Sequence, residues 1–552
     1  MTPEELGEKV SWAIKELAAS GALPEAPELE IKIERPKNPD FGDYATNVAL
    51  LLAARAEHQP RKVAELVISQ LKSVTEIESM SVAGPGFINF KVAKGSQAEL
   101  VREILQQKES YGTNKDLAGL KINVEFISAN PTGPLHLGHT RWAAVGDCLA
   151  RLLKAAGAEV VKEFYINDRG IQMDKFGESI QAAALGKSIP DDGYHGAYIK
   201  ELANKIVEQD PELVNLPEDE GLIAFREAGY KLQLAQQQEV LNLFRTVFDV
   251  WYSERKLHES GAVEKGIQVL KGHGHVFEED GALWLRTTDF SDDKDRVLIK
   301  ADGEYTYFAS DTAYYVDKRR RGMDVNIYLL GADHHGYVNR LKAVAACAGD
   351  DSEKNIEVLI GQLVKMTKDG QEVKLSKRAG NIITLEDLVE EVGVDAARYT
   401  LSRYPADSPL TLDINLLTSH TNDNPVFYVQ YAHARLSTLL RAAKERGIEF
   451  ALTDFVPEIL IDDKESDLVK TLAEYPKIVK ISAALREPHR IARYAEELAG
   501  VYHRFYDSCR VLPREDEQVT GLTIARLLLC SATRQVLANA LDLLGVLAPE
   551  KM

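Results

Sequence analysis

Two histidines three positions apart lie in a segment suited to binding a phosphate group. His136 and His139 fall in ANPTGPLHLGH, which follows the strand-like run INVEFI and precedes the helical pattern GHTRWAAVGDCLARLLKAAG. A helix start presents free backbone N–H groups and the positive end of the helix dipole, so this loop suits an anion. Gly138 has no Cβ, which would let an adenine or a ribose approach closely. The histidine spacing alone is also met by a strand–turn–helix joint with two incidental histidines.

A basic segment far downstream could complete such a phosphate site. Lys374, Ser376 and Lys377 lie in KLSKR. Alone, this segment is typical of a solvated basic loop. Paired with HLGH, its lysines suit the positioning of anionic groups and the neutralisation of charge on phosphate oxygens. We expect the two histidines and the two lysines in those roles.

Carboxylates near predicted strand ends could select a cationic substrate. A guanidinium offers five donors in a rigid fork, so a site that selects it should present carboxylates in matching geometry. Glu125 lies in the strand-like run before the histidine loop, and Tyr307 and Asp311 lie in YTYFASDTAYY. Asp311 could instead cap the helix that follows, and Glu125 could be a buried structural charge. Spacing leaves both interpretations open.

The elements that must position these residues alternate along the chain. The strand-like runs INVEFI, VVKEFYI, NIYLLG and IEVLIG are separated by helical patterns, which is typical of a doubly wound parallel sheet. We therefore expect residues 111–415 to form a Rossmann-like α/β catalytic domain. Long helical patterns between about 185 and 275 interrupt the alternation, and we interpret them as an insertion between the halves of the sheet.

Two further domains are expected on either side. Residues 1–110 predict a small α+β unit, with an amphipathic helix near the start, an alternating strand pattern over 29–33, a second helix over 41–56, and a turn and strand in GPGFINFKV. After about residue 415 only helical patterns occur, so residues 416–552 predict an all-α bundle. A chain of 552 residues is too long for one core, which agrees with several domains.

Composition limits the classes of protein. No apolar stretch reaches the length of a membrane helix, and the N-terminus is acidic and amphipathic rather than signal-like, so we expect a cytoplasmic protein without membrane attachment. Four widely spaced cysteines without a CxxC pair argue against structural zinc and against a disulfide framework. The net charge of −19 counts mildly against a nucleic-acid partner, although a basic groove can lie on an acidic body.

The two motifs resemble the HIGH and KMSKS signatures of class I aminoacyl-tRNA synthetases, with Leu in place of Met and Arg in place of the last Ser. The wider phrases VEFISANPTGPLHLGH, DDKDRVLIKADGEYTYFASDTAYY and IYLLGADHHGYVNRLKA resemble the arginyl-tRNA synthetases in particular. The similarity covers nearly the whole chain and is weakest around 185–275 and 445–480. It implies an arginine--tRNA ligase that transfers arginine to the 3′-terminal adenosine of tRNA(Arg). In the first step the L-arginine carboxylate would attack the α-phosphate of ATP in line, form arginyl-adenylate and release pyrophosphate, with Mg²⁺ arriving on ATP.

The resemblance also implies roles for individual residues in the catalytic domain. Positions matching Ser128 and Asn130 hold the backbone groups of the amino acid in that family. Positions matching Glu125, Tyr307 and Asp311 hold its side chain. His334, in GADHH, matches a position that contacts the substrate but varies in type.

For the flanking domains the resemblance implies contacts with tRNA and a monomeric enzyme. The N-terminal unit resembles the domain that touches the outer corner of tRNA, where Phe87 and Asn89 match an aromatic and an amide that read a D-loop base. A core position for Phe87 is an equal alternative. The C-terminal helices resemble the anticodon-binding bundle of the same family, without a prediction for single residues.

Two other functions compete with this hypothesis. Another class I adenylylating enzyme would share HLGH and KLSKR, but the cysteine-specific member should carry zinc ligands, and small-molecule nucleotidyl transferases would lack the flanking domains. An inactive tRNA-binding paralogue is the second alternative. The intact histidines and lysines of both motifs speak against it.

Overall fold

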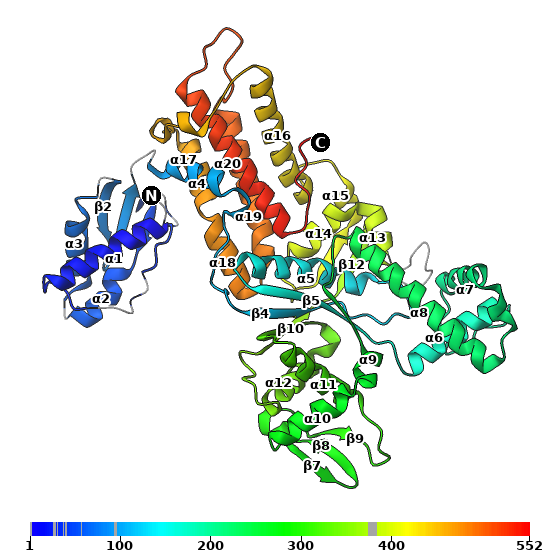
Figure 1. The fold of residues 1–552 in the computed structure, drawn as a ribbon. Helices are drawn as coiled ribbons and strands as arrows, with labels where there is room; N and C mark the ends of the chain where they lie inside the picture. The colour runs from blue at the N-terminus through cyan, green and yellow to red at the C-terminus, as the bar shows by residue number, and fades with distance from the viewer. Residues whose placement is uncertain are drawn as a thin grey trace.

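The structure is a computed structural model that describes residues 3–25, 29, 31–36, 38, 41–56, 58–74, 76–92, 96–373 and 383–552. Figure 1 shows a small N-terminal unit, a central parallel sheet, a helical lobe that projects to one side and a C-terminal helix bundle. None of the described helices is both long and apolar enough to cross a membrane.

The N-terminal unit is a three-stranded antiparallel sheet with helices and an apolar core of its own. Its elements are α1 (Pro3–Ala19), β1 (Tyr44–Thr46), α2 (Val48–Ala56), α3 (Pro60–Leu71), β2 (Ile77–Ala83) and β3 (Phe87–Val92). The strand predicted over 29–33 is not found among the described residues there; the nearby pairing is a single bridge between Glu34 and Ala45. The helix predicted over 41–56 begins only at Val48, because the residues before it pair with β3.

The central sheet contains five parallel strands in the order β11-β10-β4-β5-β6. The strands are β4 (Lys121–Glu125), β5 (Glu159–Ile166), β6 (Val250–Ser253), β10 (Val325–Gly331) and β11 (Ile356–Gly361). Four of these were predicted, and β6 was missed because VWYS is short. The chain extends the sheet in opposite directions from β4 and β10, and ligands of such sheets bind outside the carboxyl ends of the strands at this switch point.

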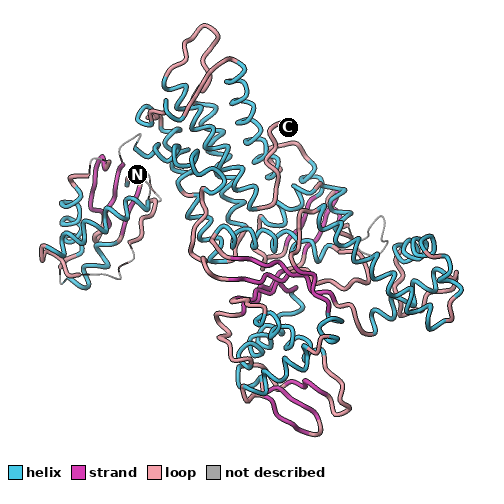
Figure 2. Tube along the Cα trace, viewed as in Figure 1, coloured by secondary structure: helices cyan, strands magenta, loops and turns pink. Residues whose placement is uncertain are grey.

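Helices cover both faces of this sheet, as Figures 1 and 2 show. One face carries α5 (Leu137–Ala155), and the other carries α10 (Ala262–Gly272), α11 (Tyr307–Arg320) and α12 (Val338–Cys347). Between β6 and α11 lie α9 (Glu254–Glu259) and an antiparallel sheet of β7 (Val276–Glu279), β8 (Ala282–Leu285) and β9 (Arg296–Ile299), which the sequence analysis did not predict.

The helical lobe begins and ends earlier than the predicted insertion at about 185–275. It consists of α6 (Ile171–Ala184), α7 (Ala197–Gln209) and α8 (Glu218–Leu243), which enclose a separate apolar cluster. The range shifts because β6 already pairs with β5 from Val250 onward, so the chain has returned to the sheet by then.

The C-terminal half passes from small elements into the bundle. The connecting elements are β12 (Val364–Lys368), β13 (Gln371–Glu372), α13 (Leu385–Val392), α14 (Val394–Ser402), β14 (Leu410–Asp413) and α15 (Ile414–Thr418). The bundle contains α16 (Pro425–Glu445), α17 (Asp463–Ala473), α18 (Tyr475–Leu485), α19 (His489–Ser508) and α20 (Gly521–Leu543), and the earlier helix α4 (Leu100–Gln107) packs against α20.

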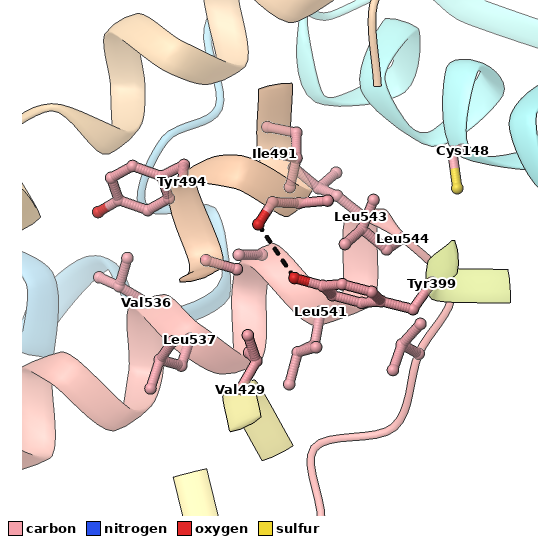
Figure 3. Packing of buried hydrophobic residues seen from close by; sticks show 14 of the residues in the cluster. Cys148, Tyr399, Val429, Ile491, Tyr494, Val536, Leu537, Leu541, Leu543 and Leu544 are labelled. Atoms are coloured by element: carbon pink, nitrogen blue, oxygen red, sulfur yellow. Dashed lines mark hydrogen bonds between the residues drawn. The ribbon is translucent and has the colours of Figure 1, made fainter. Parts of the chain in front are cut away.

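Bundle and central sheet share one continuous core. Tyr399 of α14 points into the apolar residues of the bundle, and its hydroxyl donates a 3.0 Å hydrogen bond to the carbonyl of Ala492 (Figure 3). The neighbouring Arg398 is fully buried and pairs with Asp147 of α5 at 2.7 Å. Arg398 Nε also donates a 3.2 Å hydrogen bond to the carbonyl of Leu544, just after α20, so this buried arginine links α5 and α14 to the end of the bundle.

Candidate active site

The loop that leaves β4 begins with a strained turn. Ile127 and Ser128 both have left-handed backbone angles, with φ of 71° and 45°. Such angles cost of order 1–3 kcal/mol each in residues other than glycine and persist only where the surroundings hold them. The Ser128 hydroxyl donates to Glu125 Oε1 at 3.0 Å and accepts from the backbone N–H of Tyr165 at 3.2 Å. Ser128 thus ties the turn to two strands of the sheet.

The two motif histidines stack at the start of α5. Their ring centroids lie 3.8 Å apart. His136 Nδ1 accepts the backbone N–H of Gly138 at 3.1 Å, and His139 Nδ1 accepts the backbone N–H of His136 at 3.2 Å. Burial lowers the pKa of His136, and burial together with His136 lowers the pKa of His139 to about 3. Both rings are therefore neutral near pH 7, and with Nδ1 accepting, each keeps its proton on Nε2 as a donor.

Gly138 lies directly beside the ring of His136. A Cβ at this position would lie 2.9 Å from Cε1 of His136, which is closer than real Cβ atoms come to other atoms. The contact of Gly138 with an adenine or a ribose stays a prediction. Glycine is required here because the capping histidine folds back over the first turn of the helix.

Two carboxylates influence each other's surroundings beside the sheet: Glu254 is buried directly after β6, and Asp311 is half-buried within α11. Burial and the charge of Glu125 raise the pKa of Asp311 to about 6, although the Tyr337 hydroxyl donates a hydrogen bond to its Oδ2. Burial and the charge of Asp311 raise the pKa of Glu254 to about 7. Among the described residues, neither forms an ion pair with a lysine or an arginine. Two such carboxylates favour a cation beside them, because a bound cation would relieve the repulsion.

Glu254 and Tyr337 were missed from the sequence. Glu254 begins α9 directly after β6, whose run VWYS was not recognised as a strand. Tyr337 lies three residues after His334 in GADHHGYV. A search for a carboxylate after every short aromatic run would have found Glu254. Nothing in the sequence pattern separates Tyr337 from other surface tyrosines.

Glu125 differs from these carboxylates, because it already has a cationic partner. Its Oε2 lies 2.5 Å from Nζ of Lys318, a fully buried residue of α11. The lysine ammonium also lies 4.0 Å from the ring centroid of Tyr328. These contacts favour the interpretation of Glu125 as a buried structural charge over that of a direct ligand for a guanidinium.

The capping interpretation of Asp311 is wrong. The N-cap of α11 is Thr306, whose hydroxyl accepts the backbone N–H of Ala309 at 3.2 Å. Asp311 lies within the helix. Tyr307 is the first residue of α11 and is 71% exposed, so it lies at the surface of the site rather than in the buried pocket.

The remaining predicted substrate contacts lie around the pocket. The Asn130 side-chain amide donates a hydrogen bond to Gln172 at the start of α6. His334 is exposed and lines a cavity of about 600 Å³ together with Tyr337 and Arg340. Ser128 is thus hydrogen-bonded to Glu125, and Glu125 lies close enough to Asp311 to raise its pKa. Tyr307 and His334 are exposed at the rim of the site.

KLSKR, with Lys374, Ser376 and Lys377, lies outside the described residues. The chain directly after it is described and pairs with the histidine loop. The backbone N–H of Leu137 donates to the carbonyl of Ile383 at 2.8 Å, and that of Leu385 donates to the carbonyl of Leu135 at 2.8 Å. A segment only six residues after Lys377 is thus hydrogen-bonded to the start of α5.

On the N-terminal unit the two predicted tRNA contacts differ. Phe87 is 41% exposed at the start of β3, which argues against the core alternative and leaves a ring face open. Asn89 is buried between β1 and β2, so its side chain is not available for a contact with a base in this structure.

A row of aromatic rings lies on the bundle along α16 and α19. Phe427 stacks on Tyr431 at 5.9 Å between centroids, and Tyr431 stacks on His503 at 6.0 Å. The guanidinium of Arg435 lies 3.8 Å from the ring centroid of Tyr506. We call these five residues the aromatic row. Aromatic and arginine planes of this kind can stack on unpaired RNA bases.

Three family models match the chain in succession. They are described as the arginyl tRNA synthetase N terminal domain, over residues 4–92, the class I (R) tRNA synthetase catalytic domain, over residues 100–407, and the DALR anticodon binding domain, over residues 429–552.

Whole proteins are similar over the full length as well. An arginine--tRNA ligase from Frankia alni is 53% identical over 552 residues and covers 100% of both chains, and one from Renibacterium salmoninarum is 53% identical over 555 residues with the same coverage. The solved arginyl-tRNA synthetase of Thermus thermophilus covers 100% of both chains with a TM-score of 0.75 and 23% identity, which shows a shared fold.

Proposed function

The chain belongs to the arginyl-tRNA synthetase family and joins arginine to tRNA with ATP, and from this premise we propose how its pocket works. Asp311 and Glu254 bind the guanidinium of arginine, and the His136–His139 pair binds the phosphates of ATP. The observation that carries the proposal is a pair of carboxylates that form no salt bridge with a lysine or an arginine among the described residues. Their pKa values stay raised although the charges of Arg340 and Arg169 act on Asp311 and Glu254, which favours a bound cation.

Selection of arginine follows from charge and geometry. A guanidinium with five donors can satisfy two carboxylates at once, and the Tyr337 hydroxyl holds the Asp311 carboxylate in place. Glu125 is paired with Lys318 and acts on arginine only indirectly, because its charge raises the pKa of Asp311. The exposed Tyr307 is the candidate for contact with the aliphatic part of arginine, and Ser128, Asn130 and His334 are further candidates for contact with arginine.

The first reaction step needs positioning rather than a protein nucleophile. An oxygen of the arginine carboxylate forms a bond to the α-phosphorus of ATP, and the bond to the bridging oxygen of pyrophosphate breaks. Negative charge builds on the phosphate oxygens, where the Nε2–H groups of His136 and His139 and the first N–H groups of α5 can donate. Lys374 and Lys377, which lie outside the described residues, are proposed to neutralise the same charge. Mg²⁺ enters with the ATP phosphates.

In the second step the terminal adenosine of tRNA takes the arginyl group. Its 2′-hydroxyl attacks the carbonyl carbon, and AMP leaves with the electrons of the broken carbon–oxygen bond. We propose that Phe87 of the N-terminal domain contacts the outer corner of the tRNA and that the aromatic row of the bundle contacts the anticodon loop. Both surfaces offer exposed ring faces for stacking.

The test is charging of tRNA with each of the twenty amino acids. We expect turnover with arginine alone. Turnover with any other amino acid in place of arginine would contradict the proposed role of the carboxylate pair. Pyrophosphate exchange should be measured with and without cognate tRNA, since it separates adenylate formation from transfer.

A further inference from the structure

Side chains of the helical lobe hold the loop that precedes the histidine motif. Gln237 of α8 is 1% exposed, and its Nε2 donates to the carbonyls of Asn130 at 3.1 Å and Gly133 at 2.8 Å. The hydroxyl of Tyr198, on α7, donates to the carbonyl of Thr132 at 3.0 Å. Two lobe residues thus bind three of the four carbonyls between positions 130 and 133.

The loop is otherwise held by the burial of Ala129, Pro131 and Thr132 and by the hydrogen bond between the side chains of Asn130 and Gln172. No backbone–backbone hydrogen bond joins residues 129–134 to another segment in the part of the chain that the structure describes. Pro131 and Pro134 have no N–H to donate. The loop also begins at the strained pair Ile127 and Ser128, which a freely moving segment would relax. Its conformation therefore depends on partners outside the loop.

The lobe is able to act as that support. Its helices enclose their own apolar cluster, which includes Phe176, Leu202 and Phe225, so the lobe has a core of its own and is not an extension of the loop. A Cβ at Gly133 would lie 3.4 Å from the Tyr198 hydroxyl, which shows how closely the loop packs on α7. In Figure 1, α8 runs from this lobe back toward the central sheet. Burying the polar Gln237 amide is unfavourable unless its N–H groups find acceptors, and the loop carbonyls supply them.

We propose that Gln237 and Tyr198 are positioning residues for adenylate formation, through which the helical lobe fixes the loop between Ser128 and His136. The inference rests on the proposed function, because the loop carries Asn130 toward arginine and leads into the histidines that bind ATP. A loop that shifts even slightly loses the alignment of the two substrates. The lobe residues touch neither substrate and act only through the loop.

The test uses two substitutions in the full-length enzyme. Gln237→Met keeps the length of the side chain but removes both donated hydrogen bonds, and Tyr198→Phe removes only the hydroxyl. Rates are expressed per active site, counted by titration of the adenylate formed in a single turnover. We expect each variant to lose about tenfold in kcat for arginine-dependent pyrophosphate exchange and to raise KM for arginine about threefold, with KM for tRNA unchanged.

A purely structural role would give a different result. It would lower the number of titratable sites and leave kcat and KM per site at the wild-type values, which would overturn the proposal. Gln238→Met is the matched control, because Gln238 follows on the same helix and forms no hydrogen bond with the loop in the described structure. If Gln237→Met fails to fold, Tyr198→Phe decides alone. If the wild-type enzyme fails to use arginine, the proposed function is wrong rather than this inference.

Discussion

At the scale of single residues, the carboxylates of the pocket differ in what neutralises them. Glu125 is paired with the buried ammonium of Lys318, whereas Asp311 receives a hydrogen bond from Tyr337 and Glu254 has no lysine or arginine partner among the described residues. Because Lys318 neutralises Glu125, we expect Glu125 to contribute little to the selection of arginine. The other two carboxylates are left for a substrate that carries its own delocalised cation.

Asp311→Asn should therefore impair arginine binding without affecting ATP. The amide keeps the size of the side chain but loses the charge, and loss of one partner of a buried charge pair costs several kcal/mol, so we expect KM for arginine to rise by about a hundredfold or more. Steady-state pyrophosphate exchange at varied arginine and varied ATP measures both constants. Asp280→Asn, at an exposed turn between β7 and β8, is the control. Unchanged KM for arginine would refute the role of Asp311.

Arginine binding should also weaken as the pH falls through 7 and then 6. The pKa of Glu254 is raised to about 7 and that of Asp311 to about 6, so below these values each carboxyl must lose a proton before it can pair with the guanidinium. We expect KM for arginine to rise up to about tenfold per pH unit below 7 and more steeply below 6. Glu254→Gln should remove the upper inflection only. A flat profile between pH 5.5 and 8 would contradict the assignment.

The same shifts have the opposite effect on the free enzyme. The ordinary pKa values of Asp311 and Glu254 are 3.8 and 4.5, and both are raised by folding. The folded protein thus binds more protons than the unfolded chain between about pH 4 and 7, so these two groups lower the free energy of unfolding as the pH rises through that window. Bound arginine should offset this loss, so adding arginine should raise the free energy of unfolding in this pH range.

At the scale of elements, the start of α5 combines two tasks in one side chain. His136 caps the helix through Nδ1 and offers Nε2–H to the site. The caps of α11 and α13 are ordinary threonines, Thr306 and Thr384. A histidine in this position is a poorer choice for capping than Asn or Asp, so its presence at α5 points to use of the second nitrogen.

His136→Asn should separate the two tasks. Asparagine is a favourable N-cap and can accept the N–H of Gly138, so we expect the thermal midpoint to stay near that of the wild type. The lost donor should lower kcat for adenylate formation about 10²- to 10³-fold. His136→Ala, which removes cap and donor together, should lower both the midpoint and the rate. An Asn variant with wild-type kcat would leave His136 with a structural role only.

The hydrophobic patterns predicted four strands of the central sheet correctly but missed β6 and misplaced the end of the helical lobe. INVEFI, VVKEFYI, NIYLLG and IEVLIG became β4, β5, β10 and β11, because buried parallel strands are almost continuously apolar. VWYS, a strand of four residues, gave no such signal. The end of the helical lobe was misplaced for the same reason, since only the pairing of β6 with β5 shows where the chain rejoins the sheet.

Candidate site residues that belong to sequence motifs could be predicted, whereas residues that reach the site only through tertiary contacts could not. The histidine loop and Asp311 could be found from spacing and similarity. Lys318 could not, because only the fold brings it within 2.5 Å of Glu125 across 193 positions of the chain. The support of the loop by Gln237 was equally hidden, because the glutamine lies in a helical pattern with no distinguishing feature.

At the scale of the whole molecule, an acidic chain must bind a polyanion. The net charge is −19, so contact with tRNA depends on local surfaces rather than on the overall field. Two candidates lie on different domains: Phe87 on the N-terminal unit and the aromatic row on the bundle. An ion pair of 2.9 Å between Arg35 and Glu474, and another between Asp43 and Lys470, connect these two domains.

If both surfaces contact one tRNA, their effects should multiply. Phe87→Ala and Arg435→Ala should each raise KM for tRNA about fivefold or more, since stacking on a base contributes about 1–3 kcal/mol. The sites share no partners, so the double variant should show the product of the two increases, with KM for arginine and ATP unchanged at saturating tRNA. Leu51→Ala, an exposed apolar residue of α2, is the control. A double variant no worse than the more impaired single variant would contradict independent contacts of both surfaces with one tRNA.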